Sequence, residues 1–269
     1  MGGFGEVSER LRRSTVRVSP GRASSGQRRG FGSGVVWNAA GLVLTNAHVA
    51  THPESRVELW DGRSFPARLT ARDPRRDLAI LQIAAEGLEP ATPGDSGALR
   101  IGELVIAVGN PMGFAGAVST GVVHSTGRLA GMGRQSWILA NVRLAPGNSG
   151  GPLADAQGRV VGINTAVLNG LGVAAPSNAV ADFLRLGPRP SLGVTMRPVS
   201  LGLMILEVEE GSAAAAASLR PGDVLLIPMD DLSAALDSGR DTLRLPFLRG
   251  DTRRVRETVV RLAPEAVAA

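Results

Sequence analysis

The sequence predicts a mostly β protein with two all-β halves, followed by a smaller α/β unit. Glycine and proline are abundant (35 and 17 of 269 residues) and aromatic residues make up only 3%, which favours short elements joined by turns over long helices. Short apolar runs recur at roughly regular spacing as far as about residue 186, a pattern typical of β-sandwiches or barrels. Pro, Gly, Ser and Asp gather at Pro90–Leu99 and divide this region in two.

The predicted strands are apolar runs, many of them bounded by Gly, Pro, Asn or Asp. In the first half they are Gly34–Trp37, Leu42–Thr45, Arg56–Leu59 and Leu78–Leu81. In the second half they are Leu104–Val108, Gly121–His124, Ser136–Leu139 and Arg159–Ile163. A short helix is expected at Ser177–Leu184, with Ser177 as N-cap and an apolar face of Val180, Phe183 and Leu184.

The segment Gly187–Pro190 has the composition of a linker. Beyond it we expect strands near residues 203–208, 224–227, 242–247 and 256–262, and helices near 213–217 (capped by Ser212) and 231–236. The expected division of the chain is an N-terminal segment 1–13, an all-β domain 14–187, a small domain 188–264 and a tail 265–269.

Composition excludes several classes of site and partner. The chain has no cysteine, so it has no disulfide, thiolate nucleophile or Cys-ligated zinc. Every basic residue is arginine, and the net charge is +5. Arginines cluster early but lack interleaved aromatics or a nucleic-acid motif, so we expect a solvated entry segment and no nucleic-acid partner; they are Arg10, Arg12, Arg13, Arg17, Arg22, Arg28 and Arg29.

The sequence shows neither a signal-peptide pattern at its start nor an apolar run of about 18 residues, so we expect no membrane-spanning helix. Two locations stay open: the cytoplasm, or an extracytoplasmic compartment if an export segment was removed before the numbering begins.

The segment Pro146–Leu153 (PGNSGGPL) is the most informative one for function. Ser149 lies on a tight turn between glycines, which allow unusual backbone angles and close approach of a ligand. Backbone N–H groups in such a turn are free to hold a developing oxyanion beside an exposed hydroxyl. The segment therefore indicates a nucleophilic serine.

A nucleophilic serine needs a base, and the base needs an orienting acid. His48 follows the predicted strand Leu42–Thr45, where a turn can present its ring, whereas His52 lies in a Pro-flanked loop and His124 within a strand. Asp77 directly precedes a buried strand. The order His48, Asp77, Ser149 is that of the two-barrel serine proteases.

The chain resembles the HtrA (DegP-like) family, chymotrypsin-fold serine proteases with a C-terminal PDZ domain. The resemblance implies two six-stranded antiparallel β-barrels followed by a small PDZ-like domain, and no cofactor or metal. The matching segments are collinear: Gly32–Val36, Leu44–Val49, Asp61–Arg63, Asp77–Leu81, Val108–Gly113, Pro146–Leu153, Gly162–Ala166 and Ala175–Asn178.

The resemblance assigns roles to individual residues. Ser149 would attack the scissile carbonyl, His48 would accept and return its proton, and Asp77 would orient His48. The N–H groups of Gly147 and Ser149 would form the oxyanion hole, with Asn148 shaping the loop. Thr165 resembles the residue that supports the aspartate and pairs with substrate backbone.

Other segments resemble PDZ signatures. Ser191–Val194 resembles the carboxylate-binding loop, with Leu192, Gly193 and Val194 as its candidate residues, and Glu210–Ala213 and Leu219–Leu225 match further signatures. This region is shorter than usual, so two alternatives stay open: capture of C-terminal peptides by strand addition, or a domain that only packs against the protease.

The resemblance implies a serine endopeptidase that cleaves unfolded or misfolded proteins in protein quality control and the stress response, as a homotrimer outside the cytoplasm. Only Phe4 and Phe31 among the first 36 residues could supply aromatic trimer contacts. The alternative is a protease-fold scaffold that binds peptides or acts as a chaperone, with weak or regulated proteolysis.

The neighbours of Ser149 predict the residue that precedes the cleaved bond (P1). The loop Val167–Val173 is short, and Asn141–Ala145 stands where the family usually has an acidic-and-small pattern that ends in Asn. The bulky Arg143 in this segment could pair with a substrate acid or a neighbouring loop, or face solvent. Since Ala145 and Val173 are small or aliphatic and no acid accompanies them, we predict a small or medium aliphatic P1. Mass spectrometry of casein cleavage products tests this, and a dominant basic P1 would contradict it.

Overall fold

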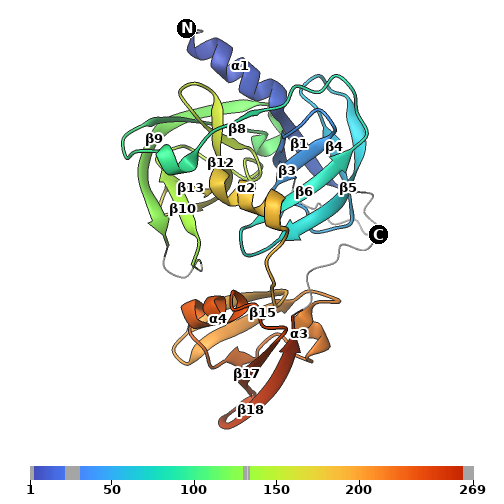
Figure 1. Ribbon diagram of the computed structural model, residues 1–269, viewed down its shortest axis with the longest axis vertical. Helices are drawn as coiled ribbons and strands as arrows, with labels where there is room; N and C mark the ends of the chain where they lie inside the picture. The colour runs from blue at the N-terminus through green and yellow to red at the C-terminus, as the bar shows by residue number, and fades with distance from the viewer. Residues whose placement is uncertain (1–2, 22–30, 130–131, 133, 263–269) are drawn as a thin grey trace. The chain divides into compact units, whose positions relative to one another are not determined.

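The computed structural model describes residues 3–21, 31–129, 132 and 134–262 (Figure 1). Arg22, Arg28, Arg29 and the expected tail 265–269 therefore lie outside the described residues. Within these residues the chain divides into two compact units, and the main division falls between Gly187 and Pro188. Of the described residues, those within 3–127 and 136–187 form the first unit, and those within 128–135 and 188–262 form the second.

The first barrel confirms the expected six-stranded antiparallel architecture. It closes in the order β1-β2-β3-β6-β5-β4. Apolar side chains from alternate positions, such as Val16, Val18, Val57 and Leu81, fill its core. The strands are β1 (Thr15–Pro20), β2 (Gly32–Val36), β3 (Leu42–Thr45), β4 (Glu54–Glu58), β5 (Ser64–Asp73) and β6 (Leu78–Ile83).

The second barrel is also six-stranded and antiparallel, in the order β8-β9-β10-β13-β12-β11, and pairing of β11 with β8 closes it. The short strand β7 (Thr92–Pro93) adds to β12 in parallel, and the 3-10 turns are η1 (Ser96–Ala98) and η2 (Pro111–Gly113). The strands are β8 (Leu104–Gly109), β9 (Ala117–Arg128), β10 (Ser136–Ala140), β11 (Pro152–Asp155), β12 (Arg159–Leu168) and β13 (Leu171–Pro176).

The prediction of a solvated entry segment is wrong for the described N-terminal residues. Phe4–Ser14 forms helix α1, which packs against β1 and β8 (Figure 1). Val7 and Leu11, four residues apart and therefore on one face, are only 6% and 2% exposed. The arginines occupy the other faces, and Glu9 pairs with Arg12 and Arg13. The charge density of the segment concealed this apolar stripe.

Helix α2 (Ser177–Leu186) ends the first unit and differs from the expectation in two ways. Pro176 is its N-cap and Ser177 is its first residue. The Ser177 hydroxyl instead donates to the Gly94 carbonyl (2.8 Å) and accepts from the Ser96 N–H (3.0 Å). Val180 and Phe183 are buried as expected, but Leu184 is 36% exposed because it lies off the buried face.

The second unit is a five-stranded sheet with two helices, ordered β14-β15-β16-β17-β18. Ser212 caps α3 by accepting the Ala215 N–H, as expected. Val194, expected in a loop, opens strand β14, which the sequence did not reveal. The elements are β14 (Val194–Val199), β15 (Gly202–Val208), α3 (Ala213–Ala216), β16 (Val224–Leu225), α4 (Met229–Leu236), β17 (Thr242–Arg249) and β18 (Asp251–Arg261). None of the helices in the described part of the chain is long and apolar enough to cross a membrane.

The burial of α1 generates a stability prediction. Leu11→Ala removes a side chain that is 2% exposed, so it should lower the free energy of unfolding by about 2–4 kcal/mol. Glu6→Gln on the exposed face of the same helix should change it by less than about 0.5 kcal/mol. Urea unfolding followed by circular dichroism measures both. Equal effects would show that α1 does not pack on the barrels.

Candidate active site

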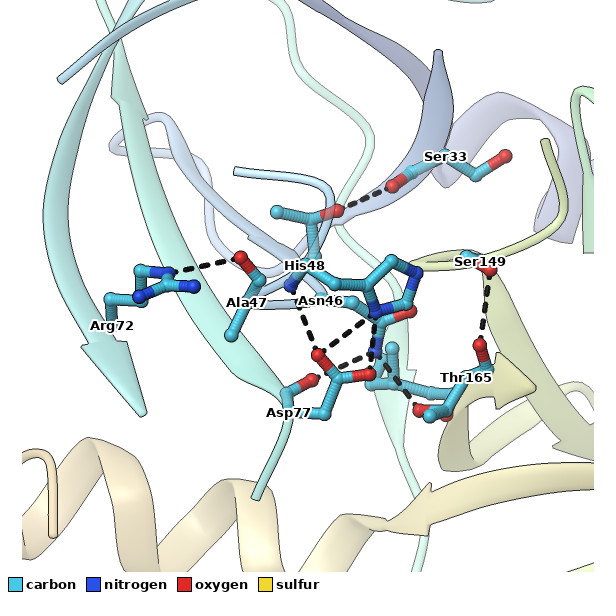
Figure 2. Close-up of polar contacts among 10 residues, drawn as sticks. Ser33, Asn46, Ala47, His48, Arg72, Asp77, Ser149 and Thr165 are labelled. Atoms are coloured by element: carbon cyan, nitrogen blue, oxygen red, sulfur yellow. Dashed lines mark hydrogen bonds and ion pairs between the residues drawn. The ribbon is translucent and has the colours of Figure 1, made fainter. Parts of the chain in front are cut away.

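The first barrel brings His48 and Asp77 together. His48 follows β3, and Asp77 lies in the turn between β5 and β6. The imidazole Nδ1 of His48 lies 2.8 Å from Oδ2 and 3.0 Å from Oδ1 of Asp77 (Figure 2). The main-chain N–H of His48 also donates to Oδ1 (3.1 Å). The carboxylate thus fixes both the main chain and the ring of the histidine.

A buried ion pair stabilises the turn that presents Asp77. The Asp73 carboxylate accepts the N–H groups of Arg75 and Arg76 and binds the Arg76 guanidinium at 2.6 Å. The side chains of Asp73 and Arg76 are 0% and 3% exposed. Asp77 takes a left-handed backbone angle (φ 51°) at the end of this turn, a conformation that asparagine and aspartate tolerate better than most residues.

Asn46 and Thr165 link the two barrels behind His48. The side-chain amide of Asn46 donates to the Asp77 carbonyl (2.8 Å) and to Oγ1 of Thr165 (3.0 Å). Thr165 therefore supports Asp77 through Asn46 rather than by a hydrogen bond to its carboxylate. The sequence did not reveal this role of Asn46; its position two residues before His48 was the available signal.

The second barrel places Ser149 across from His48 in one cleft. Figure 2 shows the imidazole between Asp77 and Ser149. The Ser149 hydroxyl donates to the Thr165 carbonyl (3.1 Å). His48 and Ser149 line a cleft of about 530 Å³, together with Phe31, His52 and neighbouring residues. His52, which the sequence left in an outer loop, thus belongs to the cleft wall, whereas His124 on β9 is exposed.

The loop before Ser149 leaves two backbone amides without a hydrogen-bond acceptor among the described residues. Among the described residues, the N–H groups of Gly147 and Ser149 donate no hydrogen bond, whereas that of Asn148 donates to the Ala145 carbonyl (3.0 Å). Gly147 has φ +104°, and a Cβ there would overlap the Asn110 carbonyl oxygen. Glycine is therefore required for a turn that leaves these two donors unpaired.

The residues expected to form the P1 pocket are placed differently from one another. Ala145 is half-buried beside the nucleophile loop. Val173 lies on β13 and is fully buried (0% exposed). Val167 is 53% exposed, and Arg143 is exposed while its N–H donates to the Ser119 hydroxyl (2.9 Å).

The electrostatics of the site raise the pKa of His48. Burial lowers this pKa, but the hydrogen bond and negative charge of Asp77 raise it more, and the positive charge of Arg72 lowers it slightly. The net result is a pKa above the ordinary value of 6.5. Arg72 is held nearby by its hydrogen bond to the Ala47 carbonyl (3.0 Å). Asp77 therefore stabilises the protonated imidazole.

Two β-barrels with a serine, a histidine and an aspartate at their junction define a trypsin-like serine peptidase. A family model described as a trypsin-like peptidase domain matches residues 32–163. The HhoA serine protease of Synechocystis is 33% identical over 270 residues, which cover 83% of this chain and 68% of that protein. The chain therefore belongs to the HtrA family of serine proteases.

Two further comparisons agree with this family. A DegP-like periplasmic serine endoprotease of Marinomonas is 38% identical over 227 residues, which cover 75% of this chain and 48% of that protein. The chain thus spans about half the length of its DegP-like relatives. The structure of the HtrA-type protease AlgW with a tripeptide has a TM-score of 0.65 and 28% identity, and the match covers 97% of both chains.

The raised pKa of His48 generates a prediction. Asp77→Asn removes the negative charge and the strong acceptor, so the pKa of His48 should fall relative to the wild type. NMR titration of the His48 ring measures both values. In the wild type, the raised pKa stabilises the fold below about pH 6.5, and this contribution is lost as the pH rises through the pKa of His48. An unchanged pKa in Asp77→Asn would contradict the assignment.

Proposed function

We propose that Ser149, His48 and Asp77 form the catalytic triad of this serine endopeptidase, and that the Gly147 and Ser149 amides form its oxyanion hole. One observation carries the proposal: His48, which is paired with Asp77, shares a cleft with a serine whose loop leaves two amides unpaired. Nucleophile, base, orienter and oxyanion donors are the parts that acyl transfer requires.

The chemistry proceeds in two halves. The Ser149 hydroxyl rotates away from the Thr165 carbonyl, attacks the scissile carbonyl and gives its proton to Nε2 of His48. The amides hold the negative oxygen of the tetrahedral intermediate, and Asp77 stabilises the imidazolium. His48 then protonates the leaving amine, which yields an acyl-enzyme. Water, activated by His48, attacks the acyl-enzyme and restores Ser149.

The proposed substrates are unfolded or misfolded proteins, cleaved in protein quality control and the stress response outside the cytoplasm. The cleft between His48 and Ser149 is open, which suits extended chains rather than a single small ligand. Several relatives are named as periplasmic endoproteases. These relatives support the extracytoplasmic location.

The second unit is proposed to be a PDZ-like domain that binds the C-terminus of a peptide. HtrA-type structures hold a tripeptide or a decapeptide, and the edge strand β14 begins at Val194, directly after Leu192 and Gly193. The carbonyls of Leu192 and Gly193 accept the N–H groups of Ala214 and Glu209, so the loop is held in place. Strand addition at β14 would supply the backbone contacts.

A homotrimer is proposed for the assembly. Phe4, Met112 and Phe114 leave 50%, 69% and 69% of their surface exposed. Large exposed apolar side chains of this kind are typical of protein–protein contact sites. Phe31, the other early aromatic residue, instead lines the cleft.

One observation favours the scaffold alternative: the Ser149 hydroxyl is bonded to the Thr165 carbonyl, which makes its resting orientation unproductive. A protein in which this bond persisted would bind peptides without cleaving them. Proteolysis requires only rotation of one hydroxyl, so turnover distinguishes the two functions directly.

Casein hydrolysis tests the proposed function. The wild type should release peptides, and Ser149→Ala should lower the rate by about 10⁴-fold or more, because the nucleophile is lost while the fold is kept. Ser64→Ala, which alters an exposed serine on β5, is the matched control and should keep the wild-type rate. A folded wild type that cleaves nothing would favour the scaffold.

A further inference from the structure

Ser33, the second residue of β2, touches the nucleophile loop at two points. It is completely buried (0% exposed). Its hydroxyl donates to the Gly147 carbonyl (2.7 Å), and its main-chain N–H donates to the Ser149 carbonyl (2.7 Å). One residue of the first barrel thus binds the carbonyls of Gly147 and Ser149, the same two residues whose amides are unpaired.

These contacts fix the direction of the peptide groups in the loop. The N–H and C=O of a trans peptide point in opposite directions, so a bond to either end orients the whole group. The Gly147–Asn148 peptide is held by Ser33 at its carbonyl and by Ala145 at its amide. The Ser149–Gly150 peptide is held in the same way by Ser33 and the Asn164 carbonyl. Neither peptide can flip without losing two hydrogen bonds.

Ser33 is also connected, through Asn110 and Met112, to the peptide group that carries the Gly147 amide. The Asn110 N–H donates to the Ser33 hydroxyl (2.8 Å). Asn110 leads into η2, where the Met112 N–H donates to the Pro146 carbonyl (3.1 Å). That carbonyl is opposite the Gly147 N–H in the same peptide. The Ser33 hydroxyl therefore acts on both sides: it holds the loop as donor and holds the neighbouring segment as acceptor.

The backbone of β2 approaches the backbone of the nucleophile loop closely at Ser33. A Cβ on Gly150 would overlap the Ser33 carbonyl oxygen, and a Cβ on Gly32 would lie 3.0 Å from the Ser149 carbonyl oxygen. Thr45 donates its hydroxyl to the Ser33 carbonyl (2.7 Å). The backbone of Ser33 is thus fixed independently, and its hydroxyl is presented to Gly147 at a set position.

We propose that Ser33 is a positioning residue that holds the nucleophile loop in the conformation with both oxyanion donors unpaired. The inference rests on the proposed function and adds to it a residue outside the triad and the oxyanion hole. Ser33 contacts neither the two unpaired amides nor the hydroxyl of Ser149; it acts through the Gly147 and Ser149 carbonyls.

Ser33→Ala leaves the buried Gly147 carbonyl and the Asn110 N–H without this partner. The Gly147–Asn148 peptide then gains freedom, and the donors next to it are misplaced for part of the time. Since the donors act mainly in the transition state, kcat should fall by about 10- to 100-fold while KM stays within about twofold. Ser33→Cys, similar in size but a weaker donor, should give an intermediate kcat.

Ser177→Ala is the matched control. Ser177 is also a buried serine whose hydroxyl donates to one backbone carbonyl and accepts one backbone N–H, but its partners are Gly94 and Ser96. Both alanine variants should lose similar stability in urea. Only Ser33→Ala should lose kcat, measured on a chromogenic peptide with an aliphatic P1.

Hydrogen exchange by mass spectrometry supplies a readout that does not depend on turnover. Peptides covering residues 141–155 should exchange several-fold faster in Ser33→Ala than in the wild type and in Ser177→Ala. Equal exchange in all three proteins would overturn the inference. So would equal kcat in the two alanine variants. A wild type without turnover whose loop still loosens in Ser33→Ala would reject the proposed function while supporting the positioning role.

Discussion

The junction between the two barrels depends on hydrogen bonds that cross from β2 to the nucleophile loop. Ser33 donates to both the Gly147 and the Ser149 carbonyls, while its hydroxyl accepts from Asn110. Each bond contributes only about 0.5–1.5 kcal/mol net, but all are buried, so losing one partner leaves another polar group unsatisfied. The functional consequence is geometric. Each peptide group between Pro146 and Gly150 is hydrogen-bonded at its carbonyl or at both its carbonyl and its N–H, and of these N–H groups only those of Gly147 and Ser149 are unpaired among the described residues and available to a ligand.

A second set of hydrogen bonds between the barrels positions His48 relative to Ser149. The Asn46 side-chain amide donates to both the Asp77 carbonyl and the Thr165 hydroxyl. The Thr165 carbonyl accepts a hydrogen bond from the Ser149 hydroxyl. On the far side, the buried Asp73–Arg76 pair sets the turn that presents Asp77. Removing one member of that pair would leave a buried charge unpaired, which would lower the free energy of unfolding. The orientation of His48 therefore depends on residues that never touch a substrate.

The sequence predicted the candidate catalytic residues better than the residues that position them. Ser149, His48 and Asp77 stand in motifs whose residue types are dictated by acyl transfer, and a glycine-flanked serine is visible without coordinates. Ser33 and Asn46 lie in the same motifs, but their roles come from contacts with residues more than 100 positions away, which no local pattern encodes. The full burial of Val173 on β13 was likewise not evident from its position at the end of a short loop.

Some secondary-structure elements could be predicted from local patterns in the sequence, and others could not. Apolar alternation revealed strands such as β3 and β6, but β5, which the prediction left out, contains Pro66 and two arginines that interrupt its apolar pattern. In α1, charge density concealed a four-residue apolar spacing that is sufficient for burial when a barrel wall is available. β14 was missed because the resemblance assigned Val194 to a loop, although its partner β15 was predicted near residues 203–208.

Active-site titration tests most directly whether the nucleophile loop is built for acyl-transfer chemistry. The purified wild type would be treated with a fluorophosphonate, without added peptide, and analysed by intact-mass spectrometry and peptide mapping. The geometry predicts about one adduct per chain, located on Ser149, because His48 and Ser149 share one cleft and two unpaired amides lie in the nucleophile loop. A folded chain that remains unlabelled, or that carries its adduct on another serine, would contradict it.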